Sequence, residues 1–379
     1  MDVVVTGIGL VSSLGANLEV NWHNLLSNHS GVRVQQPFGE LQPRPLALIS
    51  QQPAEIIHLT QLVISSALKD AKLQPPLPDY GVVIGSSRAH QGVWENLARQ
   101  MHWEKQSDWA RWLETLPHTP AIAVARQIKA KNAVLAPMAA CATGIWTIAQ
   151  AYELIQTGHC QSAIAGAVEA PITPLTVAGF QKMGALARTG AYPFDRHREG
   201  LVLGEGAAVF VLESAHSAQA RQAKIYGQIL GFGLTCDAYH ANTPEPQSQS
   251  AIAAVKQCLA RSQLSATDID YIHAHGTATK LNDQNEAHLI QTLFPHGVAV
   301  SSTKGATGHT LGASGALGMA FCLMALQEQF LPPCVGLQVP EFDLDFVTTP
   351  RQSEIRSVLC LSFGFGGQNA VVALRKFDD

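Results

Sequence analysis

Two segments of this 379-residue sequence are apolar around their whole circumference and rich in small residues, Ala139–Ala151 and Leu311–Leu326. Both are too short, and contain too many Gly, Ala, Ser and Thr residues, to be membrane spans, so we expect no membrane partner. A helix that is apolar on all sides has to be enclosed, and small residues let two such helices approach closely. The chain is therefore predicted to fold around two buried helices, Cys141–Thr157 and Gly312–Gln327.

Strand-like and helix-like segments alternate around these two helices, which is typical of α/β proteins with buried sheets. The pattern restarts after a polar, Gln- and Ala-rich crossing near Ser214–Lys224. We therefore predict a duplicated α/β fold, with halves at 1–221 and 222–379 and the two central helices between two sheets. The expected strands are Val3–Gly9, Tyr80–Ser87, Ser162–Val168, Ala207–Glu213, Ile225–Leu234, Ile269–His275, Val298–Ser302 and two strands flanking Gly364–Gly367.

Residues 88–130 do not follow this alternation. They contain four tryptophans among charged residues, namely Trp94, Trp103, Trp109 and Trp112. One interpretation is an amphipathic surface helix whose tryptophans pack against the body, and the other is a lid or a subunit contact with aromatic anchors. We favour the subunit contact, because such a cluster would otherwise expose a large apolar area.

The composition limits the choice of partners. Charged residues make up 14% of the chain, against roughly 25% in an ordinary globular domain. So small a share indicates a large interior, a large subunit interface or both. The net charge of −4 and the lack of a basic run argue against a nucleic-acid partner.

Seven cysteines are present, none in a Cys-x-x-Cys pair. The sequence begins with a strand-like segment at Val3–Val5 and not with the basic segment of a signal peptide, so we expect reduced thiols and a cytoplasmic location. Six of the cysteines stand in apolar or ordinary contexts and are expected to serve packing. These six are Cys160, Cys236, Cys258, Cys322, Cys334 and Cys360.

The seventh cysteine, Cys141, opens the first central helix among small neighbours, Ala139, Ala140, Ala142 and Gly144. A cysteine at a helix N-terminus faces unpaired N–H groups and the positive end of the helix dipole, which both stabilise a thiolate. We therefore expect a nucleophilic thiol with a lowered pKa. The small neighbours leave room for backbone amides beside a substrate carbonyl.

Two histidines stand in matched positions beside Gly and Thr residues. His275 ends a predicted strand and precedes Gly276-Thr277-Ala278-Thr279, whose hydroxyls can bond a polar substrate arm. His309 follows Thr307-Gly308 and precedes the second central helix. A thiol combined with two imidazoles indicates acyl transfer through a covalent intermediate.

Two other assignments of these side chains are less favoured. His273 does not adjoin the turn that follows His275, so we leave it outside the site. A zinc site made of Cys141, His275 and His309 has suitable ligand types, but no close-spaced ligand pair accompanies Cys141. No metal is therefore expected.

The turn Gly364-Phe365-Gly366-Gly367 near the C-terminus lets the backbone pass close to a reacting centre. A backbone N–H in this turn could complete an oxyanion hole with the N–H of Cys141. The alternative is a simple glycine-rich turn between strands.

Together these motifs make the chain resemble the β-ketoacyl-acyl carrier protein synthases of the elongating, thiolase-fold type, over essentially its whole length. A layered α-β-α-β-α fold is what this resemblance implies. The matching motifs are Val4-Val5-Thr6-Gly7, Ala140-Cys141-Ala142, Pro193-Phe194-Asp195, Gly204-Glu205-Gly206, His275-Gly276-Thr277, Lys304 to His309 and Ser362 to Gly367.

The resemblance implies a role for each of these residues. Cys141 would carry the acyl chain as a thioester, and His275 and His309 would assist the decarboxylation of malonyl-carrier protein. Lys304 and Glu286 would support the histidines. Thr277 and Thr279 would contact the phosphopantetheine arm of the carrier protein, so no cofactor of the enzyme's own is expected. Phe365 would gate the acyl pocket, Phe180 would line it, and Asp283 would be a polar neighbour on the substrate-binding side.

The resemblance also implies partners: an acyl carrier protein, and a second subunit in a homodimer or in a heterodimer with a related ketosynthase-like chain. The sequence departs from the commonest family pattern at Leu361, where Asn is usual, at Gln368, where Thr is usual, at the bulky Trp146, and by being short before Cys141. These departures bring a specialised polyketide or polyene pathway into competition with fatty-acid synthesis.

Two alternatives belong to other classes. A non-elongating chain-length-factor subunit generally lacks the nucleophile, which Cys141 supplies here. A thiolase-like enzyme acting on coenzyme A esters usually needs a second reactive cysteine in the C-terminal glycine turn, and residues 363–367 contain none. Condensation by a ketosynthase is therefore the favoured function.

Overall fold

The protein is described by a computed structural model that covers residues 1–103 and 109–377, with the backbone alone for residues 109–111. An eleven-stranded sheet runs through the molecule in the order β12-β10-β9-β14-β15-β8-β1-β7-β6-β4-β5. Its strands are β1 (Val3–Ser12), β4 (Gly81–Gly85), β5 (Val134–Leu135), β6 (Ser162–Glu169), β7 (Gly206–Ser214), β8 (Gly227–Cys236), β9 (Tyr271–His273), β10 (Ala299–Ser301), β12 (Asp345–Phe346), β14 (Ser357–Gly364) and β15 (Gln368–Arg375). Two small ribbons lie apart from it, β2 (Arg33–Gln35) with β3 (Arg44–Leu46), and β11 (Phe330–Leu331) with β13 (Arg351–Gln352).

The two parts of this sheet repeat one topology. The order β1-β7-β6-β4-β5 in the first part matches β8-β15-β14-β9-β10 in the second. In each part the first two pairings are antiparallel and the next two are parallel. The predicted duplication is confirmed, whereas the division of the chain at residue 221 stays a prediction.

The two parts are joined edge to edge into one eleven-stranded sheet, a connection that the sequence did not predict. Three residues of β1, Val3–Val5, pair antiparallel with Gly227–Ile229 of β8. The prediction of two sheets around the central helices did not include this pairing, which joins the first strand of one half to the first strand of the other.

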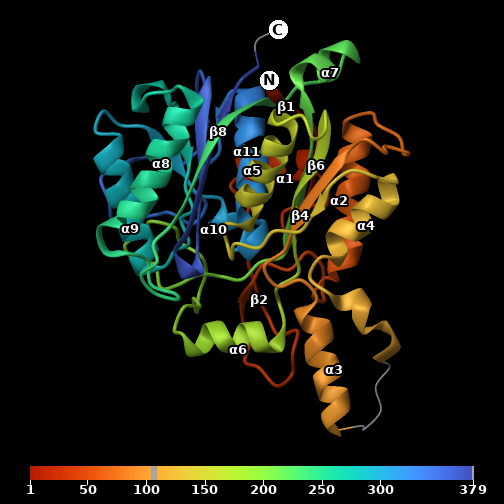
Figure 1. Ribbon diagram of the computed structural model, residues 1–379. Helices are drawn as coiled ribbons and strands as arrows, with labels where there is room; N and C mark the ends of the chain where they lie inside the picture. The colour runs from red at the N-terminus through yellow and green to blue at the C-terminus, as the bar shows by residue number, and fades with distance from the viewer. Residues whose placement is uncertain (104–108, 378–379) are drawn as a thin grey trace.

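The helices complete the α-β-α-β-α layering (Figure 1). α5 (Thr143–Gln156) and α11 (Ser314–Glu328) contact each other in the central layer and pack on both parts of the sheet. The outer layers are α2 (Ile56–Asp70) with α4 (Thr119–Ile128), and α8 (Gln249–Ser262) with α9 (Lys280–Leu293). The remaining helices are α1 (Leu18–Leu26), α3 (Gln91–Trp103), α6 (Pro174–Lys182), α7 (Ala215–Ala220), α10 (Lys304–Thr307) and the 3₁₀ helices η1 (Trp109–Thr115), η2 (Pro246–Ser248), η3 (Ala266–Asp268), η4 (Leu311–Ala313) and η5 (Phe365–Gly367).

Small residues bring the two central helices into close contact, as predicted. A Cβ atom at Gly144 in α5 would lie 2.5 Å from the backbone nitrogen of Ala316 in α11, so only glycine permits this approach. Among the described residues, Leu311–Glu328 is the one helical stretch long and apolar enough to cross a membrane, and 89% of it is buried inside the protein. It is accordingly a core helix.

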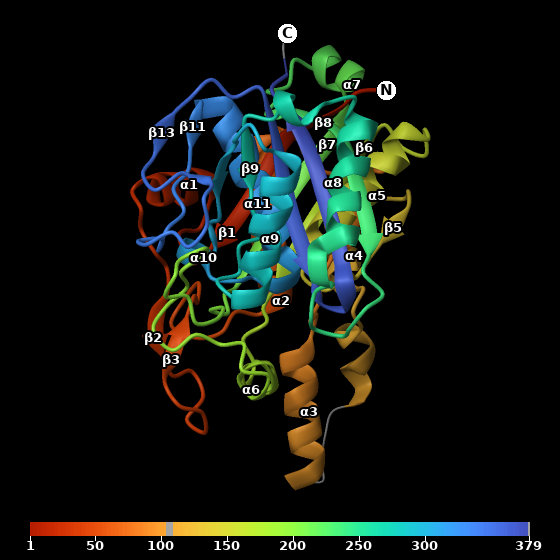
Figure 2. The ribbon, with the colours of Figure 1, turned by 90° about the vertical axis from the view of Figure 1, so that its left-hand side faces the viewer.

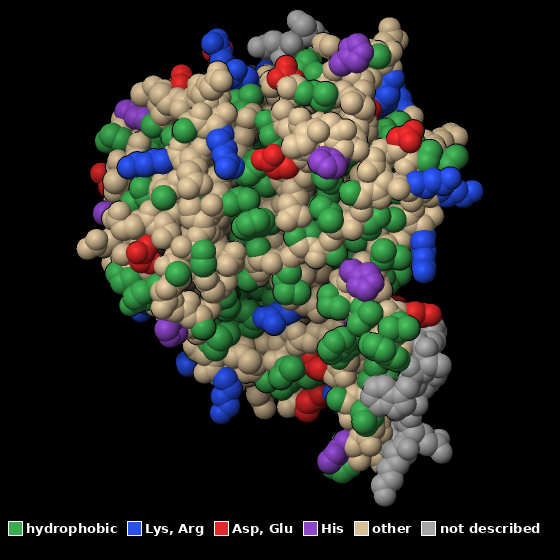
Figure 3. Space-filling model, viewed as in Figure 1, with side chains coloured by type: hydrophobic (Ala, Val, Ile, Leu, Met, Phe, Trp, Pro, Cys, Tyr) green, Lys and Arg blue, Asp and Glu red, His purple; other side chains and the backbone are tan. Residues whose placement is uncertain are grey.

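α3 projects from the body, as two perpendicular views show (Figures 1 and 2), and none of its residues is buried. Trp94 is 51% exposed, Trp103 75% and Trp112 49%, and hydrophobic side chains gather on this part of the surface (Figure 3). The interpretation in which these tryptophans pack down on the body is therefore wrong for all three, and the side chain of Trp109 lies outside the described residues. Contact with another subunit stays a prediction.

Candidate active site

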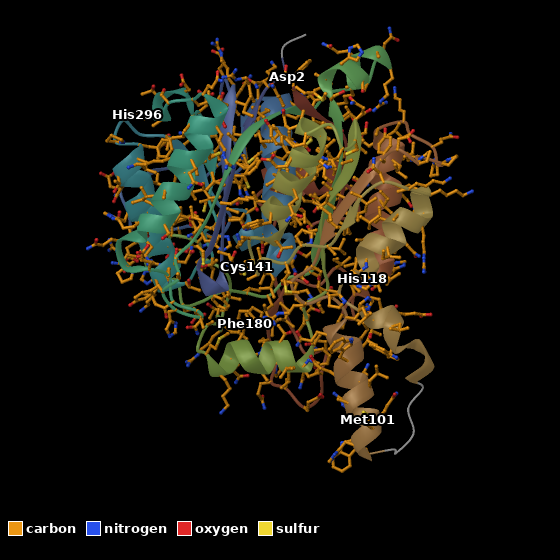
Figure 4. All side chains as sticks on the ribbon, in the orientation of Figure 1. Asp2, Met101, His118, Cys141, Phe180 and His296 are labelled. Atoms are coloured by element: carbon orange, nitrogen blue, oxygen red, sulfur yellow. The ribbon has the colours of Figure 1, made fainter. Side chains whose placement is uncertain are left out.

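One cavity of about 520 Å³ brings residues of both halves together at the lower end of the central layer. Cys141 enters it from the first half, and His275, His309 and Phe365 enter it from the second. Cys141 lies above Phe180 of α6 and well below Asp2 in the view of Figure 4. The predicted nucleophile and both predicted histidines thus share one space.

Cys141 lies at the N-terminal end of α5, next to the helix cap residue Ala142. Ala140 just before it has a φ of 47°, a left-handed conformation that alanine seldom adopts. Ser362 of β14 donates a hydrogen bond of 2.9 Å to the carbonyl oxygen of Cys141. A tight turn held by the opposite half therefore fixes the nucleophile.

The thiol of Cys141 does not have the lowered pKa that its helix position predicts. Burial raises its pKa to about 11, whereas the charge of Lys304 and the backbone N–H of Phe365 lower it by less. Two N–H groups at the N-terminus of the helix already have acceptors and do not face the sulfur. The N–H of Ala142 donates to the Ala139 carbonyl at 2.9 Å, and that of Thr143 donates to the Ala140 carbonyl at 3.2 Å. The prediction of a low pKa is wrong, and the thiol is protonated at neutral pH.

The glycine turn after β14 lies directly against the nucleophile. A Cβ atom at Gly364 would lie 3.0 Å from both the Cys141 backbone nitrogen and the Ala139 carbonyl oxygen. The backbone N–H of Phe365 faces the Cys141 thiol and lowers its pKa, and the N–H of Cys141 has no acceptor among the described residues. Two backbone N–H groups therefore flank the sulfur, as an oxyanion hole requires.

His275 is held from two sides. The carboxylate of Glu286 in α9 accepts hydrogen bonds from the backbone N–H of His275 at 2.6 Å and of Gly276 at 2.7 Å. The ammonium of Lys304 in α10 donates to the His275 carbonyl oxygen and lies 3.4 Å from its Nδ1. Glu286 and Lys304 thus fix the backbone and the ring of one histidine, and neither is recorded in a hydrogen bond with His309.

His309 is held by a different partner, Ser314 at the start of α11. The Nδ1 atom of His309 lies 2.8 Å from the Ser314 hydroxyl. The two imidazole rings meet edge to face with their centroids 5.3 Å apart. Because Nδ1 of each ring has a partner inside the protein, Nε2 is the nitrogen left for a substrate.

Both imidazoles are neutral at physiological pH. Burial and the nearby positive charge of Lys304 hold the pKa of His275 and that of His309 well below the usual value. Burial likewise raises the pKa of Glu286 and lowers that of Lys304. A neutral ring whose Nδ1 accepts from Lys304 carries its proton on Nε2, so His275 offers an N–H donor to the cavity.

The other predicted residues divide into two groups. Thr277 and Thr279 line the cavity with their hydroxyls 2.8 Å apart, and Phe180 lines it with its ring stacked on that of Phe365, centroids 5.8 Å apart. Asp283 is fully buried away from the cavity, where its carboxylate accepts from the Phe194 N–H at 2.8 Å. It supports the fold beside the site and does not contact the cavity.

His273, which we left outside the site, does not line the cavity either. Its ring is buried, with Nε2 3.1 Å from the Thr303 hydroxyl. In residues 1–103 and 109–377, no group of three or more His, Cys, Asp or Glu side chains is arranged to hold a metal ion.

Two side chains beside the site were missed in the sequence. Glu169 at the end of β6 is fully buried and accepts from the N–H of Gly312 at 2.9 Å, which ties the first half to the start of the second central helix. A single glutamate that ends an otherwise apolar strand was the available signal. Ser314, the partner of His309, gave no such signal, because serine is ordinary in a small-residue helix.

The chain belongs to the β-ketoacyl synthase family. Residues 50–218 match the N-terminal domain of β-ketoacyl synthases and residues 226–338 match their C-terminal domain. The 3-oxoacyl-(acyl-carrier-protein) synthase 2 of Synechocystis is 34% identical and that of Staphylococcus aureus is 33% identical, each over 99% of this chain and 98% of the relative.

Solved structures place the chain in the same family. A type II polyketide ketosynthase, solved with its acyl-carrier protein, superposes with a TM-score of 0.94 at 27% identity and covers 100% of this chain and 99% of its own. The ishigamide ketosynthase/chain length factor has the same TM-score of 0.94, the same identity of 27% and the same coverage of both chains. A β-ketoacyl synthase from Burkholderia phymatum has a TM-score of 0.90 at 27% identity, with all of both chains covered. The thiolase-like fold is thereby confirmed.

Proposed function

We propose that this chain condenses an acyl group held on Cys141 with the malonyl group of an acyl carrier protein, releasing carbon dioxide and a β-ketoacyl-carrier protein two carbons longer. The observation that carries this proposal is the convergence of Cys141, His275 and His309 on one cavity, with the Phe365 N–H against the thiol. A covalent thioester, two neutral N–H donors and an oxyanion site are what the reaction requires.

The first step moves the acyl group onto the enzyme. The Cys141 sulfur attacks the thioester carbonyl of the acyl-carrier protein, and the carbonyl oxygen becomes an oxyanion between the N–H groups of Cys141 and Phe365. The departing phosphopantetheine thiolate takes up the proton that the thiol loses. Since burial raises the thiol pKa to about 11, nucleophilic thiolate forms only as the substrate arrives.

The second step generates the carbon nucleophile. The carboxylate of malonyl-carrier protein leaves as carbon dioxide, and its electron pair forms an enolate on the remaining acetyl thioester. The Nε2–H of His275 stabilises the enolate oxygen by a hydrogen bond, and His309 supplies a second one in the tautomer in which the Ser314 hydroxyl donates to its Nδ1. Neutral rings suit this role, because a strong acid would protonate the enolate before it reacts.

The third step forms the carbon–carbon bond. The enolate carbon attacks the carbonyl of the Cys141 thioester, whose oxygen again occupies the site between the two backbone N–H groups. Collapse of this tetrahedral intermediate releases the β-ketoacyl product and returns the sulfur, which is then protonated. No cofactor enters this scheme, since both substrates arrive on phosphopantetheine and Thr277 and Thr279 line the route to the sulfur.

Partners follow from the same reaction. We propose an acyl carrier protein as the substrate donor and a second ketosynthase-like subunit, identical or related, as the structural partner. Support comes from relatives solved as a ketosynthase with its acyl-carrier protein and as ketosynthase/chain length factor pairs. We further propose a cytoplasmic location, and a role in fatty-acid or specialised polyketide synthesis.

Intact-mass spectrometry tests the proposed function. The purified protein would be incubated with a set of acyl-carrier proteins and then with malonyl-carrier protein. We expect an acyl adduct on Cys141 that disappears as a carrier protein bearing a β-ketoacyl chain two carbons longer appears. An adduct that forms on C141A as readily as on the wild type would contradict the proposal.

A further inference from the structure

A glutamate of the projecting helix α3 holds the N-terminus of α6, the helix that carries Phe180. The Glu95 carboxylate accepts hydrogen bonds from the Thr173 hydroxyl at 2.6 Å and from the backbone N–H of Leu175 at 3.0 Å. Thr173 is the N-cap of α6, and its hydroxyl accepts the N–H of Thr176. One carboxylate thus supplies acceptors where the N–H groups of a helix lack them, and its negative charge faces the positive end of the helix dipole.

The start of α3 approaches α6 closely at this point. Both helices lie side by side at the lower end of the molecule in two perpendicular views (Figures 1 and 2), and a Cβ atom at Gly92 would lie 3.3 Å from Cγ2 of Thr173. The side-chain amide of Gln91 donates to the Glu95 carboxylate at 2.9 Å and to the Thr173 hydroxyl at 3.3 Å. The first turn of α3 and the N-cap of α6 therefore form one hydrogen-bonded contact.

α6 in turn forms part of the wall of the acyl cavity. Three of its nine residues are buried, Thr176, Val177 and Phe180, and the two apolar ones belong to the cluster that contains Cys141. The Phe180 ring lines the cavity and stacks on that of Phe365, with the centroids 5.8 Å apart. α6 thus packs on the body along one face, and the contact at its N-terminus fixes where that face, and Phe180 with it, lies.

We propose that Glu95 is a positioning residue that sets acyl-chain specificity, by holding α6 so that Phe180 stays stacked on Phe365 and limits the length of the cavity. This inference rests on the proposed function, since the chain in the cavity has to be a thioester of Cys141. Without the carboxylate, the hydroxyl of Thr173 and the N–H of Leu175 would turn to water, and α6 would gain freedom to move away from the body. A longer acyl chain would then occupy space that Phe180 fills in the wild type.

Acyl transfer to Cys141 from synthetic pantetheine thioesters measures this preference without requiring the cognate carrier protein. The probes are hexanoyl and decanoyl thioesters, each over a range of concentrations, and the adduct is read by intact mass. The quantity compared is the ratio of the second-order rate constants for decanoyl and hexanoyl transfer. We expect this ratio in E95A to exceed the wild-type ratio by at least about threefold, which corresponds to one hydrogen bond of ordinary net strength.

Two further variants separate this contact from the rest of α3. E95Q keeps an oxygen that accepts the Leu175 N–H and gains an amide that donates to the Thr173 hydroxyl, so it should keep the wild-type ratio. R99A is the matched control, because Arg99 lies on the same helix with its guanidinium 3.9 Å from the Glu40 carboxylate. It should also keep the wild-type ratio, and thermal melting of each variant would establish that it is folded.

A double-mutant comparison tests whether Glu95 acts through Phe180. F180A removes the ring, so its ratio should already be raised, and adding E95A should change that ratio by less than about twofold. A change in the F180A background as large as in the wild type would mean that Glu95 acts by another route, which overturns the proposal. A purely structural role would lower the melting temperature of E95A and leave its ratio unchanged.

The outcomes separate this inference from the proposed function. A ratio in folded E95A that equals the wild-type ratio or falls below it overturns the role of Glu95 and leaves the ketosynthase proposal intact. A rise in R99A as large as that in E95A also overturns it, because any disturbance of α3 would then suffice. Absence of any adduct with both probes and with every acyl-carrier protein contradicts the proposed function and, with it, this inference.

Discussion

The loop after β4 and the loop after β9 occupy equivalent places in the two halves, and a buried carboxylate holds each of them. Glu169 accepts the backbone N–H groups of Ser87 and Arg88, and Glu286 accepts those of His275 and Gly276. The loops differ in the side chain that they bring to the site. The second presents an imidazole beside the nucleophile, and the first presents the Arg88 guanidinium, whose carbon lies 5.8 Å from the centroid of the Phe180 ring.

The two central helices differ in a similar way. The first turn of α5 positions the Cys141 sulfur, whereas the first residue of α11, Ser314, holds the ring of His309. One fold element, used twice, thus supplies the covalent chemistry in the first half and the hydrogen-bond donors in the second. The two halves should therefore respond differently when equivalent residues are changed.

Removal of the nucleophile should have the largest effect. C141A should lower condensation by at least about a thousandfold, because no thioester can form. Release of carbon dioxide from malonyl-carrier protein should persist, since the donors of the second half remain. Radiolabelled carbon dioxide and the β-ketoacyl product would be measured in parallel, and full condensation by C141A would show that the sulfur is not the nucleophile.

Removal of one imidazole should impair decarboxylation more than acyl loading of Cys141. H309A should lower decarboxylation by about a hundredfold or more, since a donor to the enolate oxygen is lost. Acyl loading of Cys141 should fall much less, because the two backbone N–H groups that serve it are unchanged. Loading by intact mass and carbon dioxide release would be compared, and an equal loss of both would mean that His309 has a structural role.

The two carboxylates offer a matched pair. E286A and E169A each leave buried N–H groups without an acceptor, so each should lower the free energy of unfolding by about 2–5 kcal/mol. Decarboxylation by the folded fraction should fall about a hundredfold in E286A, where His275 loses its anchor, and less than about tenfold in E169A. Urea unfolding and carbon dioxide release test this, and equal activity losses would remove the distinction between the loops.

The smallest effect concerns the protonation of the thiol. The positive charge of Lys304 lowers the pKa of Cys141, so K304M should raise that pKa further above its already high value. At pH 8 less thiolate would be present, and alkylation of Cys141 by iodoacetamide should slow by about threefold to tenfold. K280M, at an exposed lysine on the cavity rim, is the control; faster alkylation in K304M would reverse the sign that we assign to Lys304.

Much of the fold and site can be predicted from the sequence, because both leave strong local patterns. The two apolar helices, the strands around them and the turn at Gly364–Gly367 follow from periodicity and residue size. Cys141, His275 and His309 stand out because each interrupts or ends such a pattern. Their convergence on one cavity agrees with those predictions.

What could not be predicted depends on contacts between distant segments. The high pKa of Cys141 results from burial and from a turn that uses the helix N–H groups, and neither is visible in the sequence around a cysteine. The pairing of β1 with β8 depends on which strand edges remain free. Glu95 lies in the stretch 88–130, where the alternation of strands and helices fails.

A single-turnover experiment on protein already acylated at Cys141 tests the division of labour between the halves most directly. After rapid mixing with malonyl-carrier protein, carbon dioxide, the Cys141 adduct and the β-ketoacyl product would be followed over time. We expect the adduct to disappear and the product to form in equal amounts. At every time point the carbon dioxide released should equal or exceed the product formed. Product that accumulates while the Cys141 adduct persists would contradict a mechanism in which the first half holds the acyl chain and the second half activates the malonyl group.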